Sequence, residues 1–484
     1  MKLYKFLLCA CLALPVMSCD DYLDIQPKGI VIPEKSEDYE RLLNYAQLLK
    51  ASESYPNFMT DDVFMPYEDD MTGGFVSLEL PKQHLYAFNS EIFGEGESDG
   101  LWEYSYNRIY YYNVVIDDIM GATQDTEEHK KQLRAEALVG RAFEYLTLVN
   151  AYANHYDPST AATDPGVPLM LDKNINKTNL QRATVQEVYD QIKADLDEAA
   201  PNLPEKPVLN AYRASKPVGY GMLARMYLYM GDYKKALENA VISLQNNSTL
   251  MSLFPYKVVD RDKYIGRIDV PDGDENPENI YIRLAPWTFG FSATAYASEE
   301  LGSLYDQEKD QRYLLYFTKY LGGIDLDYPL WAPYIYANMA MSTPEMYLIA
   351  AECEARIGSK DKAMEYINTL RDSRIIDNVP LVASDNKDAL VKVLEERRRE
   401  MPMLGCTRLI DLKRLNREPE FAKTIVHEVN GVEYRLEPNS PKYILPIPPS
   451  VLRFNPDMYL ANLHTSFLCN LIYPTFSRIL LYSC

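Results

Sequence analysis

The stretch PVGYGMLARMYLYMGDYKKALENAVISLQ, residues 217–245, has the pattern of two helices joined by a tight turn. Apolar and small residues recur at three- and four-residue spacing on both sides of Gly231, so each half presents one face suited to packing. Glycine at the junction tolerates the backbone conformation that commonly ends a helix. We therefore expect a helical hairpin over this stretch.

The spacing within the hairpin is that of a tetratricopeptide-type helix–turn–helix unit. The matching positions are Tyr220, Leu223, Ala224, Tyr227, Gly231, Ala236 and Ala240. Tyr347, Ala351, Gly358 and Ala363 repeat four of these offsets 127 residues later. Small residues permit close helix contact, and aromatic residues fill the groove between helices. We interpret both hairpins as scaffold and not as binding sites.

Helical periodicity extends well beyond these hairpins, whereas long strands are scarce. It is strongest over 101–120, 130–153, 184–200, 217–245 and 343–371, with a charged helix near 387–401. We predict a mainly α fold whose helical scaffold covers about 101–245 and 343–415. Residues 52–100 and 250–342 are rich in turn-forming and aromatic residues, and irregular segments of this length typically carry binding surfaces.

Composition restricts the class of ligand. The 484 residues are 47% hydrophobic, which suffices for a large core, and the net charge of −21 repels nucleic acid. Tyrosine is abundant, with 39 residues against 15 Phe and 3 Trp. A tyrosine combines an apolar ring with a hydroxyl group, so this composition favours polar ligands that can stack.

The two ends of the chain differ from the body. Lys2 and Lys5 precede an apolar run, and residues 1–18 are predicted to be a lipoprotein signal peptide with Cys19 as the site of lipid attachment. The alternative is an ordinary cleaved signal with Cys19 as an unmodified early residue. Residues 459–484 form an atypical apolar tail without Asp or Glu, either a non-native extension or an appendage packed on the surface of the body (19–458).

Motifs of catalysis are missing from the sequence. There is no nucleophile elbow, metalloprotease helix, phosphate-binding loop or dinucleotide fingerprint, and the 70 acidic residues make any single carboxylate pair uninformative. We expect no catalytic residue, no cofactor and no metal, and hence no enzyme.

Two charged motifs have a plain structural interpretation. Asp272, Asp274 and Asn276 begin like a calcium loop, but Pro277 and Arg283 occupy its turn and closing positions, so we expect a solvated acidic turn. The run 395–400, EERRRE, is interpreted as a salt-bridged helix face.

Motifs along almost the whole chain resemble those of one family. They are Asp21-Tyr22-Leu23-Asp24 after Cys19, Leu101-Trp102 with Tyr106, Ile109 and Asn113, Ala135-Glu136-Ala137-Leu138 with Arg141, Pro165-Gly166-Val167-Pro168-Leu169, Arg182-Ala183-Thr184-Val185 with Asp195, Glu396-Arg397-Arg398 with Glu400, Gly405 and Arg408, Asp411-Leu412-Lys413-Arg414, Pro446-Ile447-Pro448 and Asn455-Pro456. In this order they resemble the SusD/RagB outer-membrane nutrient-binding lipoproteins.

The resemblance implies a scaffold of four tetratricopeptide-like helix pairs with a long loop-rich ligand-binding face. It also implies a lipid-anchored protein on the cell surface, at the outer membrane, that binds an oligosaccharide or another nutrient. Its partner would be a TonB-dependent, SusC-like transporter barrel that the lipoprotein caps. A lipid-anchored tetratricopeptide-type scaffold for proteins and a glycoside hydrolase are the alternative functions.

The family's ligand residues lie in variable loops, so candidates must be chosen by chemistry. A sugar ring presents an apolar face to an aromatic plane and hydroxyl groups to polar side chains. The candidates are aromatic residues with polar neighbours in irregular segments: Trp287, Trp331, Tyr296, Tyr67, Asp62 and Arg283. For each aromatic residue, core packing is the alternative.

Overall fold

The computed structural model describes residues 33–51, 54–174, 176, 180–256, 271, 273–284, 294–321, 323–333, 338–455 and 458. Its helices are α2 (Ser36–Leu43), α3 (Leu80–Tyr86), α4 (Gly100–Asp118), α5 (Glu127–Tyr152), α6 (Val185–Ala199), α7 (Lys216–Met230), α8 (Tyr233–Asn246), α9 (Glu299–Ser303), α10 (Gln311–Tyr316), α11 (Thr343–Ile357), α12 (Lys360–Arg371), α13 (Asn386–Glu400), α14 (Thr407–Leu415) and α15 (Pro449–Phe454). Its strands are β1 (Val63–Phe64), β2 (Asn279–Tyr281), β3 (Tyr296–Ala297), β4 (Phe317–Leu321), β5 (Ile324–Trp331), β6 (Met341–Ser342), β7 (Ile425–Val429) and β8 (Val432–Leu436).

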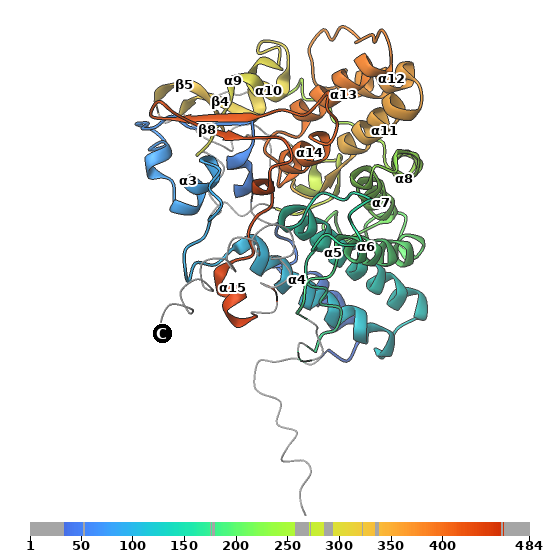
Figure 1. The fold of residues 1–484 in the computed structure, drawn as a ribbon. Coiled ribbons are helices and arrows are strands. Elements are labelled where there is room, and N and C mark those ends of the chain that lie inside the picture. Colours follow the sequence, from blue (N-terminus) through green and yellow to red (C-terminus); the bar gives the residue numbers. More distant parts are fainter. Residues whose placement is uncertain are drawn as a thin grey trace, which may run out of the picture.

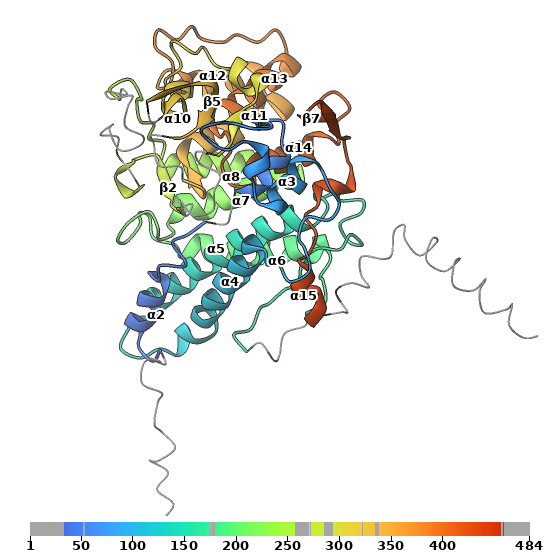
Figure 2. The ribbon, with the colours of Figure 1, turned by 90° about the vertical axis from the view of Figure 1, so that its left-hand side faces the viewer.

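The long helices form one continuous stack. Helices α4, α5, α6, α7 and α8 follow one another, and α11 packs on α8 and continues the stack to α12 and α13. Figures 1 and 2 show this order running from α4 at one end of the molecule to α12 and α13 at the other. Each helix expected from periodicity is present, so the mainly α fold is confirmed.

The hairpin α7–α8 shows how the sequence produces this geometry. Gly231 ends α7 in the left-handed conformation at φ 77°, and the Asp232 carboxylate accepts a hydrogen bond from the Lys235 backbone amide at the start of α8. Ala236 and Ala240 are fully buried, as close contact between helices requires. The second hairpin, α11–α12, begins its second helix with a Ser359 cap.

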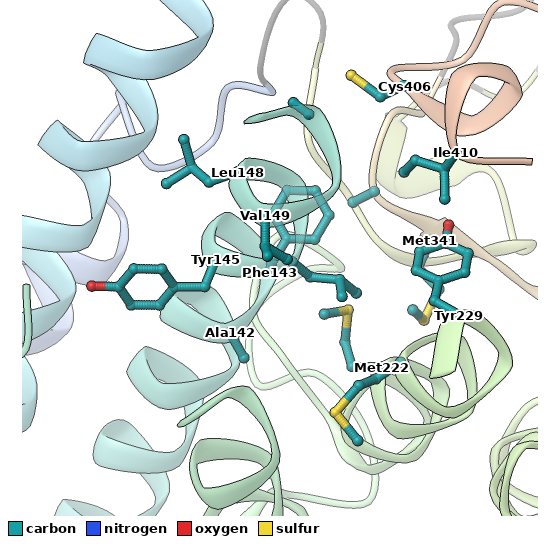
Figure 3. Packing of buried hydrophobic residues seen from close by; sticks show 14 of the residues in the cluster. Ala142, Phe143, Tyr145, Leu148, Val149, Met222, Tyr229, Met341, Cys406 and Ile410 are labelled. Atoms are coloured by element: carbon teal, nitrogen blue, oxygen red, sulfur yellow. The ribbon is translucent and has the colours of Figure 1, made fainter. Parts of the chain in front are cut away.

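The core runs along the inner side of the stack. Figure 3 shows how Phe143 of α5, Met222 and Tyr229 of α7, Met341 of β6 and Ile410 of α14 converge on one another. Burial of such side chains removes apolar surface from water and is the main favourable contribution to folding. The core thus joins the helix stack to the C-terminal segment.

A buried arginine–carboxylate pair lies at each of several helix contacts. Arg108 of α4 bonds Glu144 of α5 at 2.7 Å, and Arg141 of α5 bonds Asp195 of α6 at 2.7 Å. Similar pairs join α7 to α11, α13 to α14 and α11 to α14, formed by Arg225 with Glu345, Arg397 with Asp411, and Arg414 with Glu352. Because a buried charge is tolerated only when it is paired, these contacts fix how neighbouring helices align.

Several predictions concern residues outside the described ones. Cys19, the signal segment 1–18 and the tail 459–484 are among them, and the division of the chain into signal, body and tail stays a prediction. Among the described helices, none has the length and apolar character needed to cross a membrane.

A close contact between α4 and α5 yields a prediction about Gly140 of α5. A Cβ atom at this position would lie 2.2 Å from Tyr112 of α4, whose ring is buried and cannot swing aside. Gly140→Ala gains about 1 kcal/mol of helix propensity, but overpacking costs about 1–3 kcal/mol. We expect a lower unfolding midpoint in urea. The matched control is Gly302→Ala in α9, where the added methyl meets no atom within 4 Å and stability should not fall. Equal stability of both variants would contradict the packing argument.

Candidate functional site

A small antiparallel sheet gathers segments that are distant in the sequence. Its strand order is β1-β3-β5-β4, so the N-terminal β1 borders a sheet made otherwise of residues 296–331. Phe64 lies opposite Tyr296, and Tyr296 lies opposite Leu330. Figure 1 shows β4 and β5 at the opposite end of the molecule from α4 and α15. The two irregular segments expected to carry binding residues, 52–100 and 250–342, therefore meet in this sheet.

The loop after β1 is closed by its own hydrogen bonds. The Phe75 amide donates to the Pro66 carbonyl at 2.8 Å, and the Val76 amide donates to the Tyr67 carbonyl at 3.1 Å. Gly74 has φ 68°, and a Cβ atom there would lie 2.8 Å from the Pro66 carbonyl oxygen, so only glycine fits. The loop consequently holds the exposed Tyr67, Glu68 and Asp70 in a defined position.

We define the aromatic surface as Tyr328 of β5, the rings of Phe64 and the buried Tyr296 that lie against it, and the exposed Tyr67 in the loop after β1. The Tyr328 ring lies 4.5 Å from Phe64 and 5.8 Å from Tyr296, measured between ring centroids. Tyr67 and Tyr328 are each 42% exposed. An exposed ring supported from below by other rings can stack against the apolar face of a flat ligand.

Asp69 ties the loop to the sheet beneath the aromatic surface. Its carboxylate accepts hydrogen bonds from the Tyr296 hydroxyl at 3.0 Å and from the amide and hydroxyl of Thr72. Burial alone would raise the pKa of Asp69, but these hydrogen bonds to the ionised form outweigh it and lower the pKa. Asp69 therefore stays charged and keeps the Tyr296 hydroxyl oriented.

An ion cluster with a buried centre joins the sheet to the helical scaffold. We call Asp61, Asp62, Glu300, Arg398, Arg408 and Lys423 the six-charge cluster, in which Glu300 and Lys423 are partly exposed. Asp61 accepts from Arg408 Nε at 2.8 Å and from Lys423 Nζ at 2.6 Å. Asp62 accepts from Arg398 Nε at 2.9 Å, and Arg398 also bonds Glu300 of α9. Since Asp62 precedes β1 and α9 follows β3, the cluster fixes both strands against α13 and α14.

The two adjacent aspartates differ in acidity. Burial would raise the pKa of Asp61, but Arg408, Arg398 and Lys423 outweigh it and hold that pKa well below its usual range. Burial raises the pKa of Asp62, with the neighbouring Asp61 charge acting in the same direction and Arg398 against it. Both oxygens of Asp61 are engaged by cations, so it is the principal anion of the six-charge cluster.

The sequence candidates do not all reach this site. Tyr67 is exposed in the loop after β1, whereas Tyr296 is 1% exposed and lies under the exposed Tyr328. Asp62 lies in the six-charge cluster. Trp331 is 3% exposed and packs on Phe317, so its ring offers no free face. Trp287 is outside the described residues.

Arg283 is placed in the core, away from the sheet. It is 3% exposed, donates to the Tyr112 hydroxyl of α4 at 3.1 Å and stacks on the Tyr281 ring. Burial of Trp331 and Tyr296 favours the alternative of core packing for these two aromatic residues, and Arg283 also lies in the core.

Sequence reasoning missed Phe64, Asp69 and Tyr328. The signal for Tyr328 is its position in the mixed polar and apolar run IDLDYPLW that follows the Gly322-Gly323 turn. No comparable local signal marks Phe64 or Asp69, whose roles depend on partners more than 200 residues away.

The two charged motifs also have defined surroundings. Asn276 accepts from the Glu278 amide within its own loop, and Asp274 accepts from the Ala211 amide in the segment before α7. Asp272 lies outside the described residues. The run 395–400 is salt-bridged as predicted, but Glu396 and Glu400 are buried and pair with Arg312 across the fold.

Comparison with protein families identifies the chain. Residues 21–228 match a SusD-like family model described as starch-binding and associating with the outer membrane, and residues 337–463 match the SusD family model. The chain belongs to the SusD family. Of its described helices, α2 to α6 fall wholly within the first match and α11 to α15 within the second.

Individual relatives support this assignment. SusD-like protein P38 of Formosa agariphila is 24% identical over 494 residues, covering 86% of this chain and 91% of that protein. A SusD superfamily crystal structure from Bacteroides thetaiotaomicron superimposes with a TM-score of 0.68 at 20% identity, covering 87% of this chain and 98% of the other. A SusD-like carbohydrate-binding protein from Bacteroides vulgatus gives 0.64 at 20% identity, covering 88% and 98%. These structures establish a shared fold.

The six-charge cluster leads to a prediction for Asp61. Asp61→Asn removes the anion that two cations share and leaves buried positive charge unpaired, so the free energy of unfolding should fall by about 3–5 kcal/mol. Urea denaturation measures the effect. Asp70→Asn on the exposed part of the loop after β1 is the control and should leave the midpoint unchanged. Equal losses in both variants would show that the cluster does not anchor the sheet.

Proposed function

We propose that this SusD-family protein captures glycans on the aromatic surface without transforming them chemically. The observation that carries the proposal is the exposure of two tyrosines, Tyr67 in the loop after β1 and Tyr328 on β5, where Asp62 before β1 is ion-paired with Arg398. Glu68 and Asp70 are exposed beside Tyr67 and can accept hydrogen bonds from sugar hydroxyl groups. Stacking and hydrogen bonding together are the two contacts that an oligosaccharide requires.

The buried acids of this region are unsuited to glycoside hydrolysis. A hydrolase needs an acid and a base or nucleophile that both reach the substrate. Asp61 and Asp62 are instead buried and engaged by Arg408 and Arg398. This supports binding over catalysis, in agreement with a family of carbohydrate-binding proteins.

We further propose that Cys19 carries a lipid anchor at the outer membrane and that a TonB-dependent, SusC-like transporter receives the captured ligand. The family description, which associates these proteins with the outer membrane, supports the location. Several acyl chains on one cysteine would suffice as an anchor, because each buried methylene contributes about 0.8 kcal/mol. Co-purification of a large barrel protein with the lipidated chain from outer membranes tests the partner; its absence under mild detergent would oppose it.

The glycan proposal predicts a loss of affinity when either exposed ring is removed. Tyr67→Ala and Tyr328→Ala should each weaken binding by roughly 1–3 kcal/mol, provided the ring stacks on the ligand. Affinity gels containing soluble polysaccharides, followed by isothermal titration, measure the effect, and product analysis tests for hydrolysis. Tyr110→Ala on α4, where the side chain is 40% exposed, is the matched control. The proposal would be contradicted if the polysaccharide gel retained both surface variants as strongly as the wild type, or if the wild type released shorter products.

The anchor is tested separately. Cys19→Ala should move the protein from the membrane fraction to the soluble fraction while leaving its melting temperature and glycan binding unchanged, because the anchor contributes attachment and not folding. Fractionation followed by immunoblotting is the measurement. A variant that stays with the membranes after a high-salt wash would show that another element attaches the protein.

A further inference from the structure

Acidic residues outnumber basic residues around the aromatic surface. The strands of its sheet and the closed loop 65–76 contain five acidic residues, Glu68, Asp69, Asp70, Asp325 and Asp327. They contain one basic residue, Lys319 of β4. Lys319 can offset at most one of these charges, so the surroundings of the aromatic surface are negative.

The six-charge cluster does not supply the missing positive charge. It contains three acids and three bases, and its cations bond its own carboxylates. Asp61 accepts from Arg408 and Lys423, and Arg398 donates to Asp62 and Glu300. The charges within the cluster therefore balance, and the acids of the loop stay uncompensated.

Two of the acids, Glu68 and Asp70, lie at the border of the aromatic surface. They flank Asp69 in the chain, and the Asp69 carboxylate accepts a hydrogen bond from the Tyr296 hydroxyl at 3.0 Å. The ring of Tyr296 lies 5.8 Å from that of Tyr328, measured between centroids. The hydrogen bond thereby holds both acids beside the rings on which a ligand would stack.

The side chains of Glu68 and Asp70 are exposed and have no hydrogen bond or salt bridge with another described residue. Asp69 differs, because its carboxylate is used by the Tyr296 hydroxyl and by the amide and hydroxyl of Thr72. In the described part of the chain, no group of three or more acidic, histidine or cysteine side chains is arranged to hold a metal ion. The two exposed carboxylates are therefore available to an organic ligand.

The phenol of Tyr296 experiences the same negative surroundings. Burial raises its pKa, and the carboxylates of Asp69 and Asp327 raise that pKa further, with the Thr72 hydroxyl acting in the opposite direction. Although burial opposes it, hydrogen bonding lowers the pKa of Asp69, so this carboxylate is ionised at neutral pH. The principal charged neighbours of the Tyr296 hydroxyl are thus acids.

A ligand that complements this surface combines a flat apolar face with positive charge. An ammonium group offers several hydrogen-bond donors, its bonds to carboxylates are charge-assisted, and a cation is attracted to the face of an aromatic ring. A carboxylate or sulfate group on the ligand would instead be repelled by Glu68 and Asp70. A sugar ring that bears a free amino group has both properties, whereas a basic peptide lacks the flat face of the sugar.

We propose that the aromatic surface selects glycans with free amino groups, with Glu68 and Asp70 as its specificity-determining residues. This inference rests on the glycan capture proposed above and adds the class of sugar that is captured. The rings of Tyr67 and Tyr328 stack on the sugar, and the two carboxylates bind its ammonium groups. Uronates and sulfated glycans are rejected by the same charges.

Sugar tetramers that differ in charge test the selection. The probes are a glucosamine tetramer, its fully N-acetylated and therefore neutral counterpart, and an anionic galacturonate tetramer. Isothermal titration of the full chain gives the dissociation constants, at low ionic strength and at a slightly acidic pH that keeps the amino groups protonated. We expect the glucosamine tetramer to bind about five-fold more tightly than the neutral tetramer, the effect of one exposed charge pair, and the galacturonate tetramer to bind least. An ionic strength of about 1 M, where the screening length is about 3 Å, should abolish the difference.

A double variant separates charge from hydrogen bonding. Glu68→Gln with Asp70→Asn removes both charges but keeps oxygen atoms that accept hydrogen bonds from hydroxyl groups. This variant should bind the glucosamine and N-acetylated tetramers with equal dissociation constants, close to that of the neutral tetramer and the wild type. The matched control, Glu103→Gln with Glu365→Gln, makes the same change in net charge at exposed positions of α4 and α12 and should keep the preference.

Two further measurements show whether the preference depends on the rings. Tyr67→Ala with Tyr328→Ala should weaken the binding of both glucosamine-based tetramers, because stacking is lost. A lysine tetrapeptide, which has the charge without the sugar ring, should bind the wild type less tightly than the glucosamine tetramer does.

The outcomes separate this proposal from the previous one. The selection of amino sugars is overturned if the glucosamine tetramer does not bind or binds no better than its neutral counterpart. It is also overturned if the Gln/Asn variant keeps the preference or if the lysine tetrapeptide binds as tightly. None of these results contradicts glycan capture as long as neutral polysaccharides bind through Tyr67 and Tyr328. Loss of that dependence would contradict the proposed function itself.

Discussion

Most of the buried guanidinium groups among the described residues meet a carboxylate, and this pairing determines how the parts of the chain are arranged. The desolvation of an unpaired ion is far costlier than the net gain from pairing it. Arg108, Arg141 and Arg225 therefore do little to increase stability over an apolar core, but they exclude alternative alignments of the helices that carry their partners. The apolar contacts supply the driving force, and the ion pairs select one arrangement.

The same requirement positions the aromatic surface. β1 has only two residues and could not hold a place in a sheet by its own hydrogen bonds. Asp61 and Asp62 immediately before it are bound by Arg408 and Arg398, which belong to the rigid helices α14 and α13. The position of this short strand is thereby fixed by two helices, and the position of the loop that carries Tyr67 is fixed with it.

Much of the scaffold could be predicted because its information is local. The repeat of small and aromatic residues around Gly231 and Gly358 determines both hairpins, and periodicity locates the remaining long helices. The site was harder to predict, because the sequence around a tryptophan in an irregular segment does not show whether its ring is buried or exposed. Trp331 is covered by Phe317, whereas Tyr328, three residues earlier in the same strand, is exposed. Only the tertiary structure distinguishes them.

The salt bridges of residues 395–400 could be predicted from the sequence. The burial of Glu396 against Arg312 could not, because that partner lies far away in the sequence.

The six-charge cluster has a consequence for how the chain acquires its structure. Asp61 and Asp62 meet their arginines across separations of 347 and 336 residues. A polypeptide that emerges N-terminus first from a ribosome or a translocation pore presents these aspartates long before their partners exist, and closing so large a loop is entropically slow. The early helices can assemble in order, but β1 is fixed in place only when the final quarter of the chain, which carries Arg398 and Arg408, has emerged. Completion of the sheet is thus a late step in biogenesis. A truncated product would expose unpaired strand edges, which quality-control factors can recognise.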